Sequence, residues 1–196
     1  MLGFINRAFE CFLRDTYGPE IWAQVSAGAG LGFDRFEPMQ SYDLAITEHV
    51  IVAATVVLKR PRDSILEDVG TYLVSHPNLE RLRRLLRFGG VDFIEFLHSL
   101  EDLPERGHLA LADLDLPELR LIDQGGGVFR LCCRMQITGI GHLVVGLLRA
   151  MADDYGALVL IDHDGNHLGA EVVAVHLLDQ QYSKGRAFDL AALINI

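Results

Sequence analysis

The sequence has few cysteines, little positive charge and no long apolar run. Three cysteines in 196 residues cannot form a disulfide framework, so we expect reduced thiols of the kind found in the cytoplasm. A formal charge of −10, from 27 acidic residues against 17 Lys and Arg, argues against a nucleic-acid surface. The longest apolar runs, such as residues 49–58, are about half as long as a bilayer span requires. Residues 1–13 show no signal-peptide pattern. We therefore expect a soluble cytoplasmic protein with no membrane and no nucleic-acid partner.

The first half of the chain has the period of helices. Half of all residues are apolar and 22% are charged, which is typical of a folded globular protein. Ile5, Ala8, Phe9 and Phe12 recur at the spacing of an amphipathic helix. Further helices are predicted over 47–58, where a strand remains an alternative, over 79–86, where Asn78 is the expected cap, and over 93–100. Another is predicted to begin at Ser64, which has the capping-box spacing to Glu67.

After Pro104 the pattern changes to strands. Segments 118–123 and 128–137 flank three glycines, which suit a hairpin turn. A helix over 140–155, ended by Gly156, precedes a second expected hairpin with strands over 157–162 and 171–178. The predicted fold class is α+β. It consists of a helical N-terminal lobe, about 1–60, then a helix-packed antiparallel sheet lobe, about 64–178. Residues 179–196 are a C-terminal tail.

Candidate metal sites are weak. Asp162, Asp164 and Asn166 imitate the start of a calcium loop, but His167 and Val173 stand where that loop needs glycine and a bidentate glutamate. The pattern favours a solvated hairpin turn. Cys132 and Cys133 are adjacent on a predicted strand and point to opposite faces, so they are not expected to share an ion. No metal site is predicted.

Nothing in the sequence predicts an enzyme. No catalytic Ser-His-Asp spacing, phosphate-binding loop or dinucleotide fingerprint accompanies a suitable strand and helix. The arginines at 81, 83, 84 and 87 indicate the solvated face of a leucine-striped helix, with contact to an acidic partner or a phosphate as the alternative.

Three segments carry a resemblance to a known family. The opening, MLGFINRAFECFLRDTYGPEIW, resembles the start of the H-NOX family, the haem–nitric oxide/oxygen-binding domains. Its matching residues are Met1, Gly3, Ile5, Tyr17, Gly18 and Trp22. The likeness continues through 67–103, which include Gly70-x-Tyr72 and FIEFLHSLEDL. It resumes at Gly139-Ile140 and at the run Val144-Val145-Gly146-Leu147-Leu148. It extends to about residue 160.

The resemblance implies a gas sensor with the H-NOX fold. Members hold haem b between a helical and an α+β lobe, with one histidine on the iron and a Tyr-x-Ser-x-Arg strand motif on the propionates. Nitric oxide strains or breaks the iron–histidine bond and so regulates a partner, in bacteria commonly a histidine kinase or a cyclic-di-GMP enzyme such as a diguanylate cyclase. By the same resemblance, Ile5 and Phe9 are distal pocket positions and Pro117 presses on the haem.

The sequence departs from the family pattern at both haem-holding motifs. Pro104 stands at the position of the histidine ligand and has no lone pair for iron, although helical spacing from 93, 97 and 100 directs this position inward. Cys133, Met135 and Ile137 stand at the Tyr, Ser and Arg positions, and none offers a charge-assisted hydrogen bond to a propionate. Alternative axial ligands are His98, His108 and Cys133, although Gly107 and Pro104 argue against a continuous helix that reaches His108.

The sequence therefore predicts a stand-alone H-NOX-like regulatory protein that acts through a separate signalling partner, with weak, altered or no haem binding. Without haem, the space between the lobes is filled by apolar side chains or takes an apolar small ligand. Two alternatives remain open. One is a haem-based nitric oxide sensor with a non-standard ligand, and the other is a cysteine redox switch at Cys133.

Overall fold

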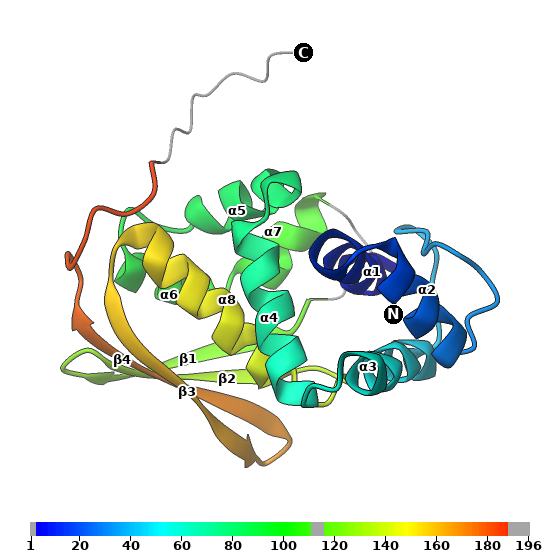
Figure 1. The fold of residues 1–196 in the computed structure, drawn as a ribbon. Coiled ribbons are helices and arrows are strands. Elements are labelled where there is room, and N and C mark those ends of the chain that lie inside the picture. Colours follow the sequence, from blue (N-terminus) through cyan, green and yellow to red (C-terminus); the bar gives the residue numbers. More distant parts are fainter. Residues whose placement is uncertain (1–2, 111–115, 188–196) are drawn as a thin grey trace.

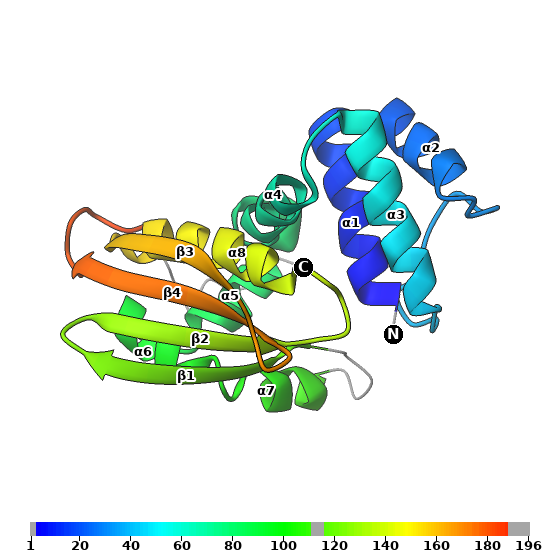
Figure 2. The same cartoon turned by 90° about the horizontal axis from the view of Figure 1, so that it is seen from below.

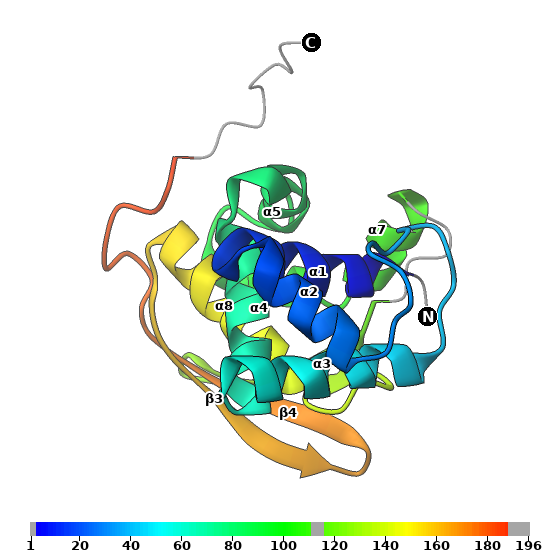
Figure 3. The same ribbon diagram turned by 45° about the vertical axis from the view of Figure 1, so that its right-hand side comes forward.

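The N-terminal helices form a lobe of their own. The computed structural model describes residues 3–110 and 116–187, apart from the side chains of residues 108–110. Helices α1 (Gly3–Tyr17), α2 (Pro19–Gly28) and α3 (Leu44–Leu58) lie together on one side of the molecule (Figure 2). Figure 3 brings this lobe forward, with α1 beside α2. The apolar stripe of α1 buries Phe9 and Phe12 in a core that this lobe shares with α4. The amphipathic pattern thus packs as the helical period predicts.

The second lobe is built on a four-stranded antiparallel sheet. Its strands are β1 (Glu118–Gly125), β2 (Val128–Arg134), β3 (Leu158–His167) and β4 (Ala170–Asp179), in the order β1-β2-β4-β3. Helix α8 (Ile140–Tyr155) lies against one face (Figure 1). The helices α5 (Glu80–Arg87), α6 (Phe93–Ser99) and α7 (Leu103–Ala110) complete this lobe, and a 3-10 turn over Pro77–Leu79 precedes α5. The fold is therefore α+β, as the sequence predicts.

Helix α4 (Arg62–Ser75) joins the two lobes and crosses α8 at backbone contact. A Cβ atom built on Gly70 would lie 2.0 Å from the carbonyl oxygen of Leu143. A Cβ atom on Gly146 would lie 1.9 Å from the carbonyl oxygen of Glu67. Only glycine permits so close an approach of two helices, which explains why glycine stands at positions 70 and 146.

Several local predictions were wrong. The helix predicted from Ser64 begins two residues earlier, at Arg62, because extended Pro61 (φ −58°, ψ 146°) occupies the N-cap position, and no capping box forms. Asn78 lies within the 3-10 turn and does not cap the next helix. The strand expected to reach residue 137 ends at Arg134. β3 extends to His167, so the imitation of a calcium loop lies on the strand and not in its turn.

The arginines of α5 are not all solvated. Arg83 is buried, and its Nε and Nη2 atoms lie 2.9 and 2.8 Å from Oδ1 of Asp154, which is fully buried near the end of α8. Arg87 lies over the ring of Tyr155, 3.8 Å from its centroid. The sequence prediction failed here because a buried partner on a distant helix leaves no local signal.

Candidate ligand cavity

An apolar cavity lies between the two cores. Its volume is about 140 Å³, and the side chains that line it are all apolar among the residues that the structure describes. Helix α1 contributes Phe4, Ile5, Ala8 and Phe9 from the helical lobe. The opposite wall comes from α4, α5, α8, β1, β2 and the segments that join them. The cavity therefore occupies the boundary between the lobes.

A void of this size destabilises the protein unless something fills it. Protein interiors are close-packed and contain few voids larger than a water molecule. At about 24 cal/mol for each Å³, an empty cavity of about 140 Å³ costs about 3 kcal/mol. Water does not relieve this cost, because the described side chains of the lining offer it no hydrogen-bond partner. Retaining such a cavity is typical of a binding site.

Four of the seven pocket positions taken from the resemblance line this cavity. They are Ile5, Phe9, Pro117 and Met135. Cys133 and Ile137 are both buried but lie in the cores on either side of it, Cys133 with the sheet and Ile137 with the helical lobe. Residues 133, 135 and 137 do not share a strand face as expected, because β2 ends before Met135.

Pro104 does not line the cavity. A single helical face over residues 93–104 was predicted, but α6 ends at Ser99 and α7 begins at Leu103, so Pro104 occupies the first turn of a new helix. Leu100 and Leu103 supply the adjacent wall instead. The position that resembles the haem ligand is thus half-buried beside the cavity, not inside it.

The alternative ligands also lie elsewhere, so far as the structure describes them. The His98 side chain is 52% exposed and faces Asp123, with Nε2 3.8 Å from Oδ2. Cys133 is buried, which raises the pKa of its thiol to about 12, and its Sγ lies 3.8 Å from the carbonyl oxygen of Leu131. The side chain of His108 lies outside the described residues. However, α7 runs without interruption over Leu103–Ala110, so the expected break before His108 is wrong: proline in the first turn starts a helix.

The described residues do not fit haem in the family's manner. An axial ligand needs a nitrogen, sulfur or oxygen atom facing the iron, and the described lining supplies apolar side chains, with the thioether of Met135 as its one soft atom. Propionates need a cationic partner, but Arg134 is 61% exposed and pairs with Glu118 on β1 at 3.7 Å.

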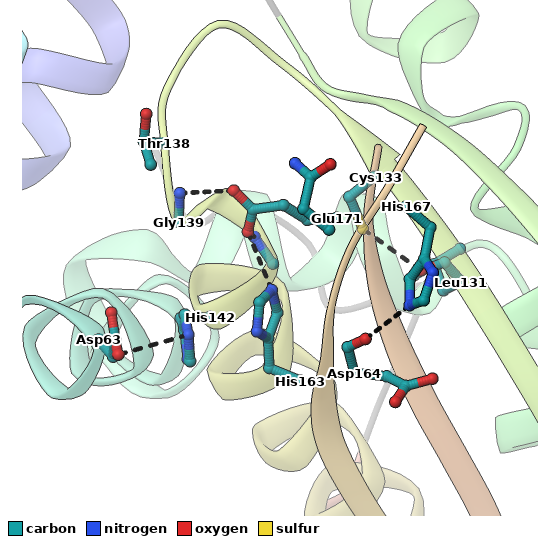
Figure 4. A network of polar contacts seen from close by, with 12 residues as sticks. Asp63, Leu131, Cys133, Thr138, Gly139, His142, His163, Asp164, His167 and Glu171 are labelled. Carbon is teal, nitrogen blue, oxygen red and sulfur yellow. Dashed lines mark hydrogen bonds and ion pairs between the residues drawn. The ribbon is translucent and has the colours of Figure 1, made fainter. Parts of the chain in front are cut away.

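A polar network fixes the end of α8 next to the cavity wall (Figure 4). The carboxylate of Glu171, on β4, accepts hydrogen bonds from the backbone N–H groups of Gly139 (2.6 Å) and Gly141 (2.8 Å). These groups lie at the N-terminus of α8, where a carboxylate is favourable to the helix dipole. His163 lies 3.1 Å from the same carboxylate, and its ring stacks on that of His142 with centroids 4.2 Å apart. Sequence reasoning missed this network because the cap comes from another element.

A metal site and a membrane span each place requirements on the described residues. Within 3–110 and 116–187, no group of three or more His, Cys, Asp or Glu side chains is arranged to hold a metal ion. Across the same part of the chain, no helix combines the length and the apolar character needed to cross a membrane. Asp164, from the imitated calcium loop, pairs with Arg130 instead.

The two lobes, the sheet and the helix crossing define the fold of a haem-NO-binding sensor domain. The model of the haem-NO-binding family matches residues 2–163, so the chain belongs to this family, also called H-NOX. It is similar in structure to an H-NOX protein from K. algicida, with a TM-score of 0.78, 15% identity, and 94% of this chain and 100% of that chain covered. It is also similar to an H-NOX protein from S. oneidensis in the Fe(II)NO state, with a TM-score of 0.77 and 15% identity. This match covers 91% of this chain and 100% of that chain.

A curated relative is a much longer protein. The soluble guanylate cyclase gcy-31 of Caenorhabditis elegans is 23% identical over 172 residues, which are 85% of this chain and 24% of that protein. The chain thus spans about a quarter of this relative's length.

Proposed function

We propose that this protein is an H-NOX sensor and regulator that works without haem held in the family's manner. The observation that carries the proposal is the interlobe cavity, whose described lining offers neither a histidine to iron nor a cation to propionates. Membership of the family supports a role in signal transduction. The lobes move relative to each other when the cavity changes its contents, and this movement is the signal.

The proposed target is a cytoplasmic signalling protein that reads the state of the lobes, such as a bacterial histidine kinase or a diguanylate cyclase. Similarity to a protein named as a guanylate cyclase supports a target in nucleotide signalling. The chain itself is proposed to have no catalytic activity. This part of the proposal also rests on the sequence, which holds no catalytic motif.

The test is an absorption spectrum of the purified protein before and after addition of haemin, with and without nitric oxide. We expect the broad absorption of free haemin, and with nitric oxide no spectral change beyond that of haemin in buffer alone, because the described pocket offers no axial histidine. A sharp Soret band that shifts with nitric oxide would instead establish a haem-based sensor.

Continuity of α7 favours His108 as the ligand in that second case, since it lies one helical turn beyond Pro104. His108→Ala would then abolish the Soret band, whereas His98→Ala, at an exposed position, would leave it unchanged. If both variants keep the Soret band, Cys133 becomes the next candidate for the axial ligand.

The redox alternative has less support. The thiolate is the reactive form of cysteine, and burial raises the pKa of Cys133 to about 12. Peroxide treatment is therefore expected to leave binding of the signalling target unchanged. A peroxide response that Cys133→Ser removes would revive this alternative.

A further inference from the structure

We infer that the interlobe cavity binds one small, uncharged, apolar molecule of about the size of benzene. The inference rests on the proposed function, because haem and this ligand would occupy the same space between the lobes. It adds the size, the polarity and the contacts of the ligand.

The volume sets the size of the ligand. The cavity measures about 140 Å³. An engineered protein cavity of about 150 Å³ with a leucine, isoleucine and phenylalanine lining stays dry and binds benzene or xenon. Drug-sized ligands and cofactors need pockets of about 300 Å³ or more. The cavity as it stands therefore admits a single ring or a short hydrocarbon chain.

The lining sets the polarity of the ligand. Leucines from α5, α8 and both β1 and β2 face the cavity, together with Phe9 and Val144. A ligand with a charge or an amide would lose its hydration and find no partner here, which is strongly unfavourable. A hydrocarbon-like ligand instead replaces empty space with dispersion contacts.

The position of the cavity gives ligand binding a consequence. Phe4 lines the cavity and is 41% exposed, so it lies where the cavity approaches the surface on α1. Ala8, one turn further along α1, lines the same cavity as Leu143 and Leu147 of α8, so both lobes contribute to its wall. A ligand in contact with both helices favours one spacing of the lobes over others, which is the condition for a population shift.

The experiment uses benzene with the whole chain, whose methionine methyl groups are labelled with carbon-13 for NMR. The chain has four methionines. Met135 lines the cavity, Met39 is 67% exposed, and Met151 is buried but is not part of the lining. We expect benzene to shift the Met135 signal saturably, to leave Met39 and Met151 in place, and to raise the melting temperature. Xenon is expected to act in the same way, and benzoate, which has the same ring with a charge, to have no effect.

Two variants and one control test the location. Ala8→Leu and Leu119→Phe place additional carbons in the cavity and are expected to weaken benzene binding by at least about tenfold. Ala45→Leu makes the same change as the first at an exposed position on α3 and should bind benzene like the wild type. If Ala8→Leu does not fold, the affinity of Leu119→Phe for benzene tests the location of the ligand.

Outcomes separate this inference from the proposed function. The inference would be overturned if the Met135 methyl signal did not shift at the solubility limit of benzene. It would also be overturned if benzoate bound as tightly as benzene, or if both cavity variants bound benzene like the wild type. The haemin spectrum is measured independently. If haemin shows no Soret band and benzene does not bind, the proposed function stands and the inferred apolar ligand is wrong. If haemin gives a sharp Soret band, the proposed function is wrong.

Discussion

At the scale of single residues, Cys133 shows how burial controls chemistry. The half-buried Cys132 beside it and the buried Cys133 point to opposite faces of β2, as expected for adjacent strand residues. Burial raises the pKa of Cys133 from 9.0 to about 12, with the neighbouring Cys132 and Glu171 adding to the shift. The thiol is therefore protonated at neutral pH, and its side chain packs in the core of the sheet lobe.

The raised pKa predicts a loss of stability at high pH. Because the unfolded thiol loses its proton near pH 9 and the folded one near pH 12, the contribution of Cys133 to stability is complete below pH 9 and is lost as the pH rises to about 12. The slope is at most about 1.4 kcal/mol per pH unit. Urea unfolding at several pH values between about 8 and 12 measures this slope of the free energy of unfolding against pH.

Cys133→Val is expected to reduce this slope, and Cys132→Val, on the half-exposed face, to reduce it much less, because burial is the largest cause of the Cys133 shift and only the smaller contribution of Cys132 is lost. Tyr155, whose pKa burial raises to about 12, adds to the slope in the wild type and in both variants, so it cancels from the comparison. Equal slopes in the two variants would contradict the assignment to Cys133.

At the scale of elements, the crossing of α4 and α8 is set by glycine. Gly146→Ala would place its Cβ atom 1.9 Å from a backbone oxygen of α4, which cannot move aside as a side chain can. We expect the helices to separate and the free energy of unfolding to fall by roughly 1–3 kcal/mol or more. Chemical denaturation measures the change.

Gly28→Ala is the matched control, because its Cβ atom would meet only the methyl group of Ala53 at 3.4 Å. It lies at the end of α2, where alanine is expected to be neutral or to stabilise by up to about 1 kcal/mol. Equal losses in both variants would show that helix propensity, and not the crossing, decides the effect.

Elements with local boundary signals could be predicted from the sequence. Helix α8 matches its predicted range because Gly139 and Gly156, both with positive φ, enclose it. The helix after Pro61 starts earlier than predicted because Pro61 itself occupies the N-cap position, and the Ser64–Glu67 spacing forms no cap. The Glu171 cap and the Arg83–Asp154 pair join elements far apart in sequence, so neither has a local pattern.

The whole molecule is two cores joined around a cavity, and this level was the hardest to predict. The family resemblance placed Ile5, Phe9, Pro117 and Met135 near a pocket, and the structure lines the cavity with them. The volume of the cavity depends on how side chains from both lobes pack, which periodicity does not determine. The misplacement of Pro104 has the same origin, because the break between α6 and α7 turns it away from the predicted face.

Arg62 is the main polar connection between the lobes near α3. Its guanidinium donates to both carboxylate oxygens of Glu48 on α3, at 2.8 and 3.0 Å, and to the carbonyl oxygen of Thr138 before α8, at 2.7 Å. Arg62→Leu removes all of these hydrogen bonds. We expect the backbone amides of α1 and α3 to exchange with deuterium about tenfold faster, with little change in β2 and β4.

Arg149→Leu is the control for this measurement, because the hydrogen bonds of Arg149, to Glu67 of α4 and to the carbonyl oxygen of Ile161 on β3, do not involve α1 or α3. It should leave exchange in α1 and α3 unchanged. If Arg62→Leu accelerates exchange equally in both lobes, the molecule opens as one unit. A cavity ligand could then not shift the lobes separately, and the signal would have to pass through another element.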